Sequence, residues 1–343
     1  MSDRLKRLLA TRPWLLADGA TGTSYFAAGL EVGGAPELWN LSHPEQVAAL
    51  HRGFLEAGAD IILTNTFGGS RYRLKLHGAQ DQVDEINRRA AEIARAEADK
   101  QDHEVVVAGS IGPTGEILEP VGALSQADTR AAFAEQAQAL AAGGADVIWI
   151  ETISSIEELT AAVAGAEDSG LPVVCTLSFD TNGRTMMGVR PAEVAALMGE
   201  LSPRPLAYGG NCGVGAAELV AVIVNMAQAA RPDDVLVAKS NCGVPEFIDG
   251  EIRYNGTPEL MADYARLARD AGVRIIGGCC GTTPDHLRTM RAALQAHEPG
   301  PAPSLETVVA RLGQITAGAM GIEPVASGAE RRRGRRRSGT PST

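Results

Sequence analysis

The sequence predicts an α/β fold, a single-domain (β/α)8 TIM barrel in which eight parallel strands alternate with eight helices. Eight short apolar runs rich in β-branched residues predict buried parallel strands, and segments with helical periodicity lie between them. Residues 57–62, 143–148 and 271–276 share one local pattern, in which a helix-ending glycine is followed two residues later by an apolar strand. An open, doubly wound sheet could use the same pattern. Eight units without a Gly-rich dinucleotide fingerprint after the first strand favour the closed barrel.

Each predicted strand is an apolar run that ends in small or polar residues, and the strands are expected at residues 14–19, 60–66, 105–112, 147–152, 173–179, 206–212, 235–242 and 274–280. The predicted helices are rich in Ala, Glu and Leu, and they are expected at residues 45–57, 81–99, 126–142, 157–166, 191–201, 216–229, 258–270 and 284–296. The start of the last helix is the clearest, because Thr283 can cap it and Pro284 suits its first position.

The composition changes near residue 298. We therefore expect residues 1–298 to form the barrel and residues 299–343 to form a Pro-rich linker, a short helix at 305–315 and a disordered tail after residue 317. The tail holds six arginines at residues 331–337. It could be a functionally neutral extension, which we favour, or it could contact RNA or a membrane surface.

Charge and hydropathy exclude several classes of protein. The formal net charge is −11, and the tail arginines leave residues 1–330 more acidic still, which argues against nucleic-acid binding by the folded domain. We find no apolar run long enough to cross a membrane and no signal peptide, so a cytoplasmic protein is expected. Five cysteines in a reducing compartment favour metal binding or catalysis over disulfides.

Three of these cysteines are expected to converge. Cys279 and Cys280 end the eighth strand and face a helix N-terminus, where thiolates are favoured, and two neighbouring thiolates require a cation. Cys212 ends the sixth strand, which only one strand separates from the eighth in a closed barrel. Three thiolates with a fourth position open are typical of a catalytic zinc site. Cys242 ends the strand between them and could be a fourth ligand or, as we favour, a bystander, whereas Cys175 lies within the fifth strand and is expected in the core.

Polar residues at other strand ends complete a candidate substrate site. Asp18 is followed by a Gly/Thr turn, beginning at Gly19, whose backbone N–H groups could hold a ligand carboxylate. Glu151 ends the fourth strand and should face a cation, because burying an unpaired carboxylate is costly. That cation could be a ligand ammonium. Alternatively, Asp18 and Glu151 could each form a salt bridge inside the barrel mouth.

With these residues in view, the chain resembles the homocysteine S-methyltransferases from residue 14 to about residue 296. The motifs that carry the resemblance are Asp18-Gly19-Ala20-Thr21-Gly22-Thr23, Thr64-Asn65-Thr66-Phe67, Gly112-Pro113-Thr114-Gly115, Glu151-Thr152, Gly210-Asn211-Cys212-Gly213 and Gly277-Gly278-Cys279-Cys280-Gly281-Thr282-Thr283-Pro284-Asp285-His286. Residues 179–189 are similar to the bacterial betaine–homocysteine branch in particular.

The resemblance implies that Cys212, Cys279 and Cys280 hold Zn²⁺ and that homocysteine sulfur takes the open position as a thiolate. It places the amino group of homocysteine at Glu151 and its carboxylate near the backbone after Asp18. The other candidate substrate-binding residues, which lie at the polar strand ends, are Gly19, Asn65, Thr66 and Asn211.

The expected reaction is zinc-dependent methyl transfer from a cationic donor to homocysteine. Glycine betaine is the favoured donor, giving methionine and dimethylglycine. S-methylmethionine, a dimethylsulfonium compound or a separate cobalamin protein are the alternative donors, and a non-catalytic zinc-binding or thiol-sensing barrel is the rival from another class. An oligomer is possible.

The chain departs from mammalian betaine enzymes at two aromatic positions, which here are Thr152 and Gly68. A quaternary ammonium prefers aromatic faces, and only 4% of the residues are aromatic. The candidates for an aromatic cage are Tyr25, Trp39, Phe67 and Tyr72.

Overall fold

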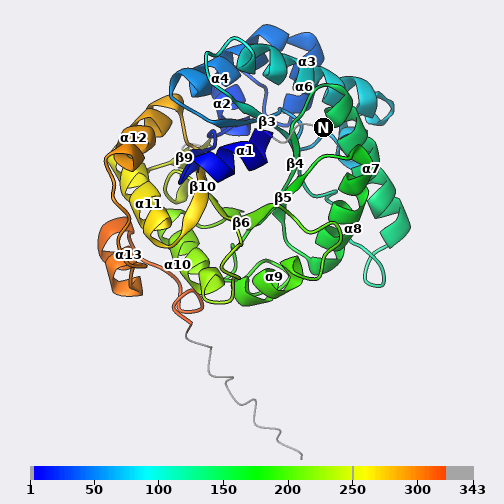
Figure 1. Cartoon of the computed structure of the whole chain (residues 1–343). Coiled ribbons are helices and arrows are strands. Elements are labelled where there is room, and N and C mark those ends of the chain that lie inside the picture. The colour runs from blue at the N-terminus through cyan, green and yellow to red at the C-terminus, as the bar shows by residue number, and fades with distance from the viewer. Residues whose placement is uncertain (1–3, 249–250, 322–343) are drawn as a thin grey trace, which may run out of the picture.

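The computed structural model describes residues 4–248 and 251–321, in which eight parallel strands form a barrel inside a ring of helices (Figure 1). The strands are β1 (Leu15–Leu16), β2 (Ile61–Leu63), β3 (Val106–Ile111), β4 (Val147–Ile153), β5 (Val173–Leu177), β6 (Ala207–Cys212), β7 (Leu236–Ser240) and β10 (Val273–Gly278). Their order is β1-β10-β7-β6-β5-β4-β3-β2. A parallel bridge between Ala17 and Ile61 joins the two outer strands and closes the barrel, as the sequence predicted.

All eight predicted helices are present, with bounds within a few residues of those expected. They are α4 (Pro44–Glu56), α6 (Val83–Ala98), α7 (Gln126–Ala142), α8 (Ile156–Ala166), α9 (Pro191–Met198), α10 (Ala216–Ala227), α11 (Pro258–Asp270) and α12 (Pro284–Gln295). Thr283 is the N-cap of α12, and its backbone N–H donates to His286 Nδ1 at 3.2 Å. This start fixes the direction in which the chain leaves Cys279 and Cys280.

Several short elements were not predicted, because they lie in loops with little periodicity. They are the helices α1 (Arg4–Thr11), α2 (Gly22–Ala27), α3 (Trp39–Ser42) and α5 (Arg71–Leu74), the 3-10 helices at Pro36–Leu38, Lys75–His77, Gln80–Gln82 and Glu167–Ser169, and an antiparallel hairpin of β8 (Pro245–Ile248) and β9 (Glu251–Tyr254). Most of them follow strands β1, β2 and β7 and so build the rim of the barrel mouth.

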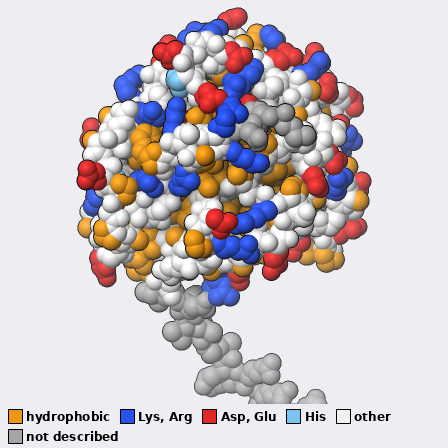
Figure 2. Space-filling view, viewed as in Figure 1, with side chains coloured by type: hydrophobic (Ala, Val, Ile, Leu, Met, Phe, Trp, Pro, Cys, Tyr) orange, Lys and Arg blue, Asp and Glu red, His pale blue; other side chains and the backbone are white. Residues whose placement is uncertain are grey.

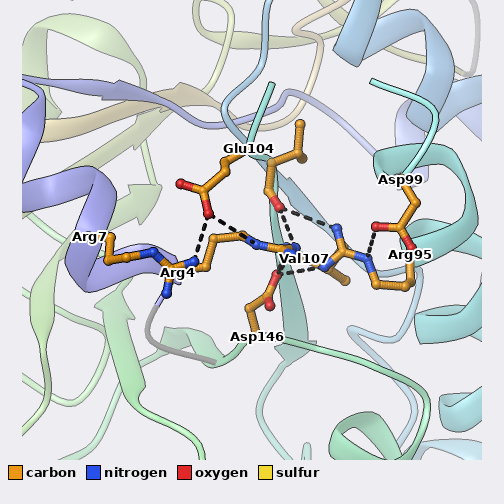
Figure 3. A network of polar contacts seen from close by, with 8 residues as sticks. Arg4, Arg7, Arg95, Asp99, Glu104, Val107 and Asp146 are labelled. Carbon is orange, nitrogen blue, oxygen red and sulfur yellow. Dashed lines mark hydrogen bonds and ion pairs between the residues drawn. The ribbon is translucent and has the colours of Figure 1, made fainter. Parts of the chain in front are cut away.

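Helix α1 lies across the opposite end of the barrel, which faces the viewer in Figure 1. Its apolar residues Leu5, Leu8 and Leu9 are buried in the same cluster as the residues that fill the barrel interior. Arg4 Nη1 donates to Asp146 Oδ2 at 3.2 Å, and Arg95 Nη1 donates to the same oxygen at 2.9 Å (Figure 3). Helix α1 therefore closes this end of the barrel with both apolar and ionic contacts.

A second ionic cluster lies at the closed end, around the buried carboxylate of Asp60. Arg12 and Arg291 bind its two oxygens at 2.6 and 2.7 Å, and the backbone N–H of Leu16 donates to it at 2.8 Å. On this face, seen in Figure 2, basic and acidic side chains lie side by side. The charges at this end of the barrel are thus used to hold the fold together.

The C-terminal segment lies on the outside of the barrel. Helix α13 (Leu305–Leu312) confirms the short helix expected there, and the boundary predicted at residue 298 falls between α12 and α13. The expectation of disorder directly after residue 317 was wrong. The backbone N–H of Gly318 donates to Asn182 Oδ1 at 2.8 Å, and Ala319 is buried, because its carbonyl accepts from Asn225 and its methyl group packs in the core.

The Arg-rich stretch at residues 331–337 lies outside the described residues. Among the residues that are described, no helix combines the length and the hydrophobicity needed to cross a bilayer.

Candidate active site

A cavity of about 500 Å³ opens at the carboxyl ends of the strands, a size within the roughly 300–1,000 Å³ of small-molecule sites. Its inner part contains side chains from the ends of β3, β4, β6, β7 and β10, namely Ser110, Glu151, Cys212, Lys239, Cys279 and Cys280. Its outer part is formed by the loops after β1 and β2, including Phe26, Glu37, Phe67, Arg73 and His77.

The structure brings together the three cysteines that the sequence singled out. The sulfur atoms of Cys212, Cys279 and Cys280 all lie within 4.8 Å of one another. Strand β7 explains this convergence, because Ser240 is the register partner of both Cys212 and Gly278. The two strand ends therefore meet across one residue of β7.

The backbone around the sulfurs is held by side chains and by close packing. Asn241 accepts from the Cys280 backbone N–H at 3.1 Å and donates to the Gly213 carbonyl at 2.7 Å, so one amide joins both cysteine loops. A Cβ atom on Gly278 would lie 2.2 Å from Thr282 Cγ2, so only glycine permits this approach. Cys212 itself has a φ of 59°, in the left-handed region that non-glycine residues rarely adopt.

The three thiol groups lie close enough to shift one another's pKa. Hydrogen bonds from Cys279 and Cys280 lower the pKa of Cys212 to about 3. The same bonds to Cys212 raise the pKa of Cys279 and raise that of Cys280 to about 12. Three soft donors at this spacing fit a divalent cation such as Zn²⁺, which would replace the thiol protons.

The other two cysteines lie apart from this cluster. The Cys242 thiol is buried and donates to the carbonyl of Gly256 at 3.3 Å, and burial raises its pKa to about 11. Cys175 is buried within β5, and burial also raises its pKa. Of the two alternatives for Cys242, this arrangement favours the bystander.

The two predicted carboxylates have different surroundings. Asp18 accepts from Lys239 Nζ at 2.6 Å and from the Leu63 backbone N–H at 2.7 Å, so the salt-bridge alternative describes it. Glu151 is 8% exposed and lines the cavity, where it accepts from Ser110 Oγ at 2.5 Å. Burial raises the pKa of Glu151, while Lys239 and the bond from Ser110 act in the opposite direction.

The remaining predicted residues divide into two groups. Gly19 and Asn65 line the cavity, and Asn65 Nδ2 donates to the Pro36 carbonyl at 2.7 Å. Thr66 and Asn211 are buried outside the lining. Thr66 Oγ1 donates to the Ser110 carbonyl at 2.7 Å, and the Asn211 amide bonds to Thr152. These two residues support the wall of the cavity.

Lys239, Ser110 and Glu37 were missed. Lys239 lies within an apolar strand, and its polarity was the one signal that could have identified it. Glu37 is buried in the outer part of the cavity and accepts from the Gly68 backbone N–H at 2.6 Å, and burial raises its pKa. Of the four candidate cage aromatics, Phe67 alone lines the described cavity. Tyr25 and Trp39 pack against each other with ring centroids 5.3 Å apart.

Comparisons with known sequences indicate the family of this chain. Residues 15–294 match the sequence model of the homocysteine S-methyltransferases. The chain is 32% identical over 309 residues to a methionine synthase of Mycobacterium leprae, covering 84% of this chain and 25% of that protein. It is 32% identical over 298 residues to a methionine synthase of Mycobacterium tuberculosis, covering 82% of this chain and 24% of that protein. The chain thus spans about a quarter of the length of these curated relatives.

Solved structures share the fold. The metallated form of the homocysteine methyltransferase MmuM from Escherichia coli superposes with a TM-score of 0.70 at 24% identity, covering 84% of this chain and 99% of that one. Its oxidized form gives a TM-score of 0.68 at 25% identity, covering 84% and 99%. A methyltransferase from Methanosarcina mazei gives 0.55 at 15% identity, covering 86% and 98%. By the match over residues 15–294, this chain belongs to the homocysteine S-methyltransferase family.

Proposed function

We propose that this protein transfers a methyl group to the sulfur of homocysteine, forming methionine, with Zn²⁺ held by Cys212, Cys279 and Cys280. The observation that carries the proposal is the group of three sulfurs within 4.8 Å of one another, at the wall of a cavity that also contains a buried carboxylate. When bound there, zinc would lower the pKa of the substrate thiol and maintain the thiolate, which is the nucleophilic form.

The protein's own groups would orient the amino acid. Glu151 lies in the same cavity as the three sulfurs and offers a carboxylate oxygen to the substrate ammonium. Ser110 Oγ donates a 2.5 Å hydrogen bond to Glu151 Oε1 and so holds the Glu151 side chain in one rotamer. The loop that begins at Gly19 lies over the cavity and helps to exclude water from the sulfur, which strengthens these charge interactions.

Glycine betaine is the first donor that we propose. In this reaction the substrate sulfur forms a bond to a methyl carbon, the carbon–nitrogen bond breaks, and its electron pair stays on nitrogen to give dimethylglycine. The cavity offers the outer carboxylate of Glu37 to the quaternary ammonium, and Arg73 and His77 to the donor carboxylate. Phe26 and Phe67 supply two aromatic faces.

A methyl group delivered by a separate cobalamin protein is the second candidate. The named relatives are methionine synthases about four times as long as the region they share with this chain, so the rest of their length could supply the donor. The small number of aromatic residues in the cavity also fits a donor that is not a quaternary ammonium.

A donor panel tests both candidates. The zinc-loaded full chain is incubated with homocysteine and, in separate reactions, with betaine, S-methylmethionine, a dimethylsulfonium compound or a methylcobalamin carrier protein, and methionine is measured. Methionine from betaine supports the first proposal, and methionine from the carrier protein alone supports the second. If no donor yields methionine, and homocysteine leaves the spectrum of the cobalt-substituted protein unchanged, the protein is not a methyltransferase of this kind.

A further inference from the structure

Lys239 lies at the floor of the cavity and is held in place from several sides. Its Nζ is 2.6 Å from Asp18 Oδ1, and its side chain is 3% exposed. The ring of Trp149 lies close to the ammonium, with 5.6 Å between Nζ and the ring centroid. The second oxygen of Asp18 is bound by the backbone N–H of Leu63. Asp18 is therefore itself fixed, and the ammonium has little freedom to leave its position.

Lys239 lines the cavity, whereas Asp18 lies behind it, outside the lining. Asp18 therefore acts on a ligand in the cavity through its ion pair with Lys239. Two anionic groups, Asp18 and Glu151, outweigh the effect of burial and keep the lysine charged. Among the described residues, the cavity lining contains two further cationic or titratable basic side chains, Arg73 and His77, which lie beside Glu37 in the outer part. Lys239 interacts electrostatically with both Glu151 and Cys279.

We infer that Lys239 binds the α-carboxylate of the substrate, so that Lys239 and Glu151 together select a thiol that is also an α-amino acid. This inference rests on the proposed function and adds a side-chain partner for a group that was expected to bind backbone N–H groups near Gly19. The ammonium and carboxylate of an amino acid are attached to one carbon atom. They therefore require opposite charges close together, as Lys239 and Glu151 provide beside the sulfurs.

This arrangement gives Asp18 a positioning role. One N–H of the lysine is bound to Asp18, which leaves two for a ligand. A thiol without a carboxylate would offer no acceptor to the other two N–H groups of this buried ammonium, and sites built to hydrogen-bond a substrate group reject analogues that lack it.

The test measures binding of three thiols by calorimetry to the zinc-loaded full chain. The thiols are homocysteine, its decarboxylated analogue aminopropanethiol and its deaminated analogue mercaptobutanoate. In Lys239→Met we expect the affinity for homocysteine to fall on the order of 10- to 100-fold, because a charge-assisted hydrogen bond is lost. The affinity for aminopropanethiol should stay the same, and Lys239→Arg should restore part of the affinity for homocysteine.

Two further variants keep the result interpretable. Lys239→Met leaves Asp18 buried without a cation, so Asp18→Asn/Lys239→Met removes both charges together and should show the same selectivity with a folded protein. Arg73→Met removes the cation of the outer cavity that is proposed to bind the donor, and its binding of homocysteine without donor shows whether Arg73 holds the amino-acid carboxylate in place of Lys239. Lys239 does not bind the carboxylate if Lys239→Met and the double variant weaken homocysteine and aminopropanethiol equally, or weaken neither. The same conclusion follows if Arg73→Met selectively loses affinity for homocysteine. If the wild type binds none of the three thiols, the proposed function itself is wrong.

Discussion

The side chain of Asn211, near the end of β6, forms two hydrogen bonds with Thr152, near the end of β4. Asn211 Oδ1 accepts from the Thr152 backbone N–H at 2.9 Å, and Asn211 Nδ2 donates to Thr152 Oγ1 at 2.7 Å. Thr152 has a φ of 64°, which is unusual for a β-branched residue. Because Thr152 follows Glu151 and Asn211 precedes Cys212, this pair of bonds connects the candidate ammonium site to a candidate zinc ligand.

Replacing Asn211 with Ala should therefore affect both stability and binding. Two hydrogen bonds of the buried Asn211 amide are lost, so we expect the free energy of unfolding to fall by about 1–3 kcal/mol. Thr152 would no longer be held in its strained conformation, and homocysteine affinity should fall more than zinc affinity. Chemical denaturation and calorimetry measure these effects. Asn225→Ala is the matched control, because it removes one amide hydrogen bond on the outer surface. Equal loss of homocysteine affinity in the two variants would contradict the role of Asn211.

Alanine variants of the five cysteines distinguish the proposed zinc ligands from the two cysteines outside the cluster. Cys212→Ala, Cys279→Ala and Cys280→Ala should each reduce the zinc content from about one ion per chain to nearly none, because two thiolates do not complete the site. Cys175→Ala and Cys242→Ala are the controls. They should keep the zinc and lose about 1 kcal/mol of stability through small cavities. Zinc is measured by atomic emission after dialysis. Full zinc content in any of the first three variants would remove that cysteine from the ligand set.

The sequence allowed the barrel and the sulfur cluster to be predicted for the same physical reason. Parallel strands bring their carboxyl ends to one edge, so Cys212 and Cys280 could be placed together once the strands had been counted. Chain-local signals such as Thr283 and Pro284 also fixed the start of the helix that follows. These features depend on periodicity and on the residues next to one another in the chain.

Pairings across the barrel interior could not be predicted in this way. Asp18 and Lys239 are 221 positions apart, and nothing in either segment indicates that one will neutralise the other. Asn211 was expected to bind substrate as part of the motif Gly210-Asn211-Cys212-Gly213, and its amide bonds to Thr152, whose backbone lies in the left-handed region. Such contacts depend on side-chain packing, which one sequence does not specify.

Glu151→Gln tests the ammonium site with little change in shape. The amide can still accept from Ser110, but it no longer offers a charge to the substrate ammonium. We expect homocysteine affinity to fall at least about 10-fold, since a hydrogen bond to a charged group contributes about 1.5–3 kcal/mol. Mercaptobutanoate has no ammonium and serves as the control ligand, whose affinity should not fall. Unchanged homocysteine affinity in calorimetry would exclude this role for Glu151.

The buried His51 predicts how stability depends on pH. His51 lies in α4, and burial lowers its pKa to about 4, against the opposing charges of Asp18 and Glu97. The unfolded chain should bind this proton near pH 6.5, so the stability that His51 contributes is complete above that pH and is lost as the pH falls toward 4. When the pH is lowered from 7 to 4.5, the free energy of unfolding should fall by about 2–3 kcal/mol less in His51→Gln than in the wild type. Denaturant titrations at several pH values measure the difference. The exposed His103 gives the control His103→Gln, which should follow the wild type. If the two variants respond to pH alike, then His51 is not buried in its neutral form, and another group causes the loss of stability in acid.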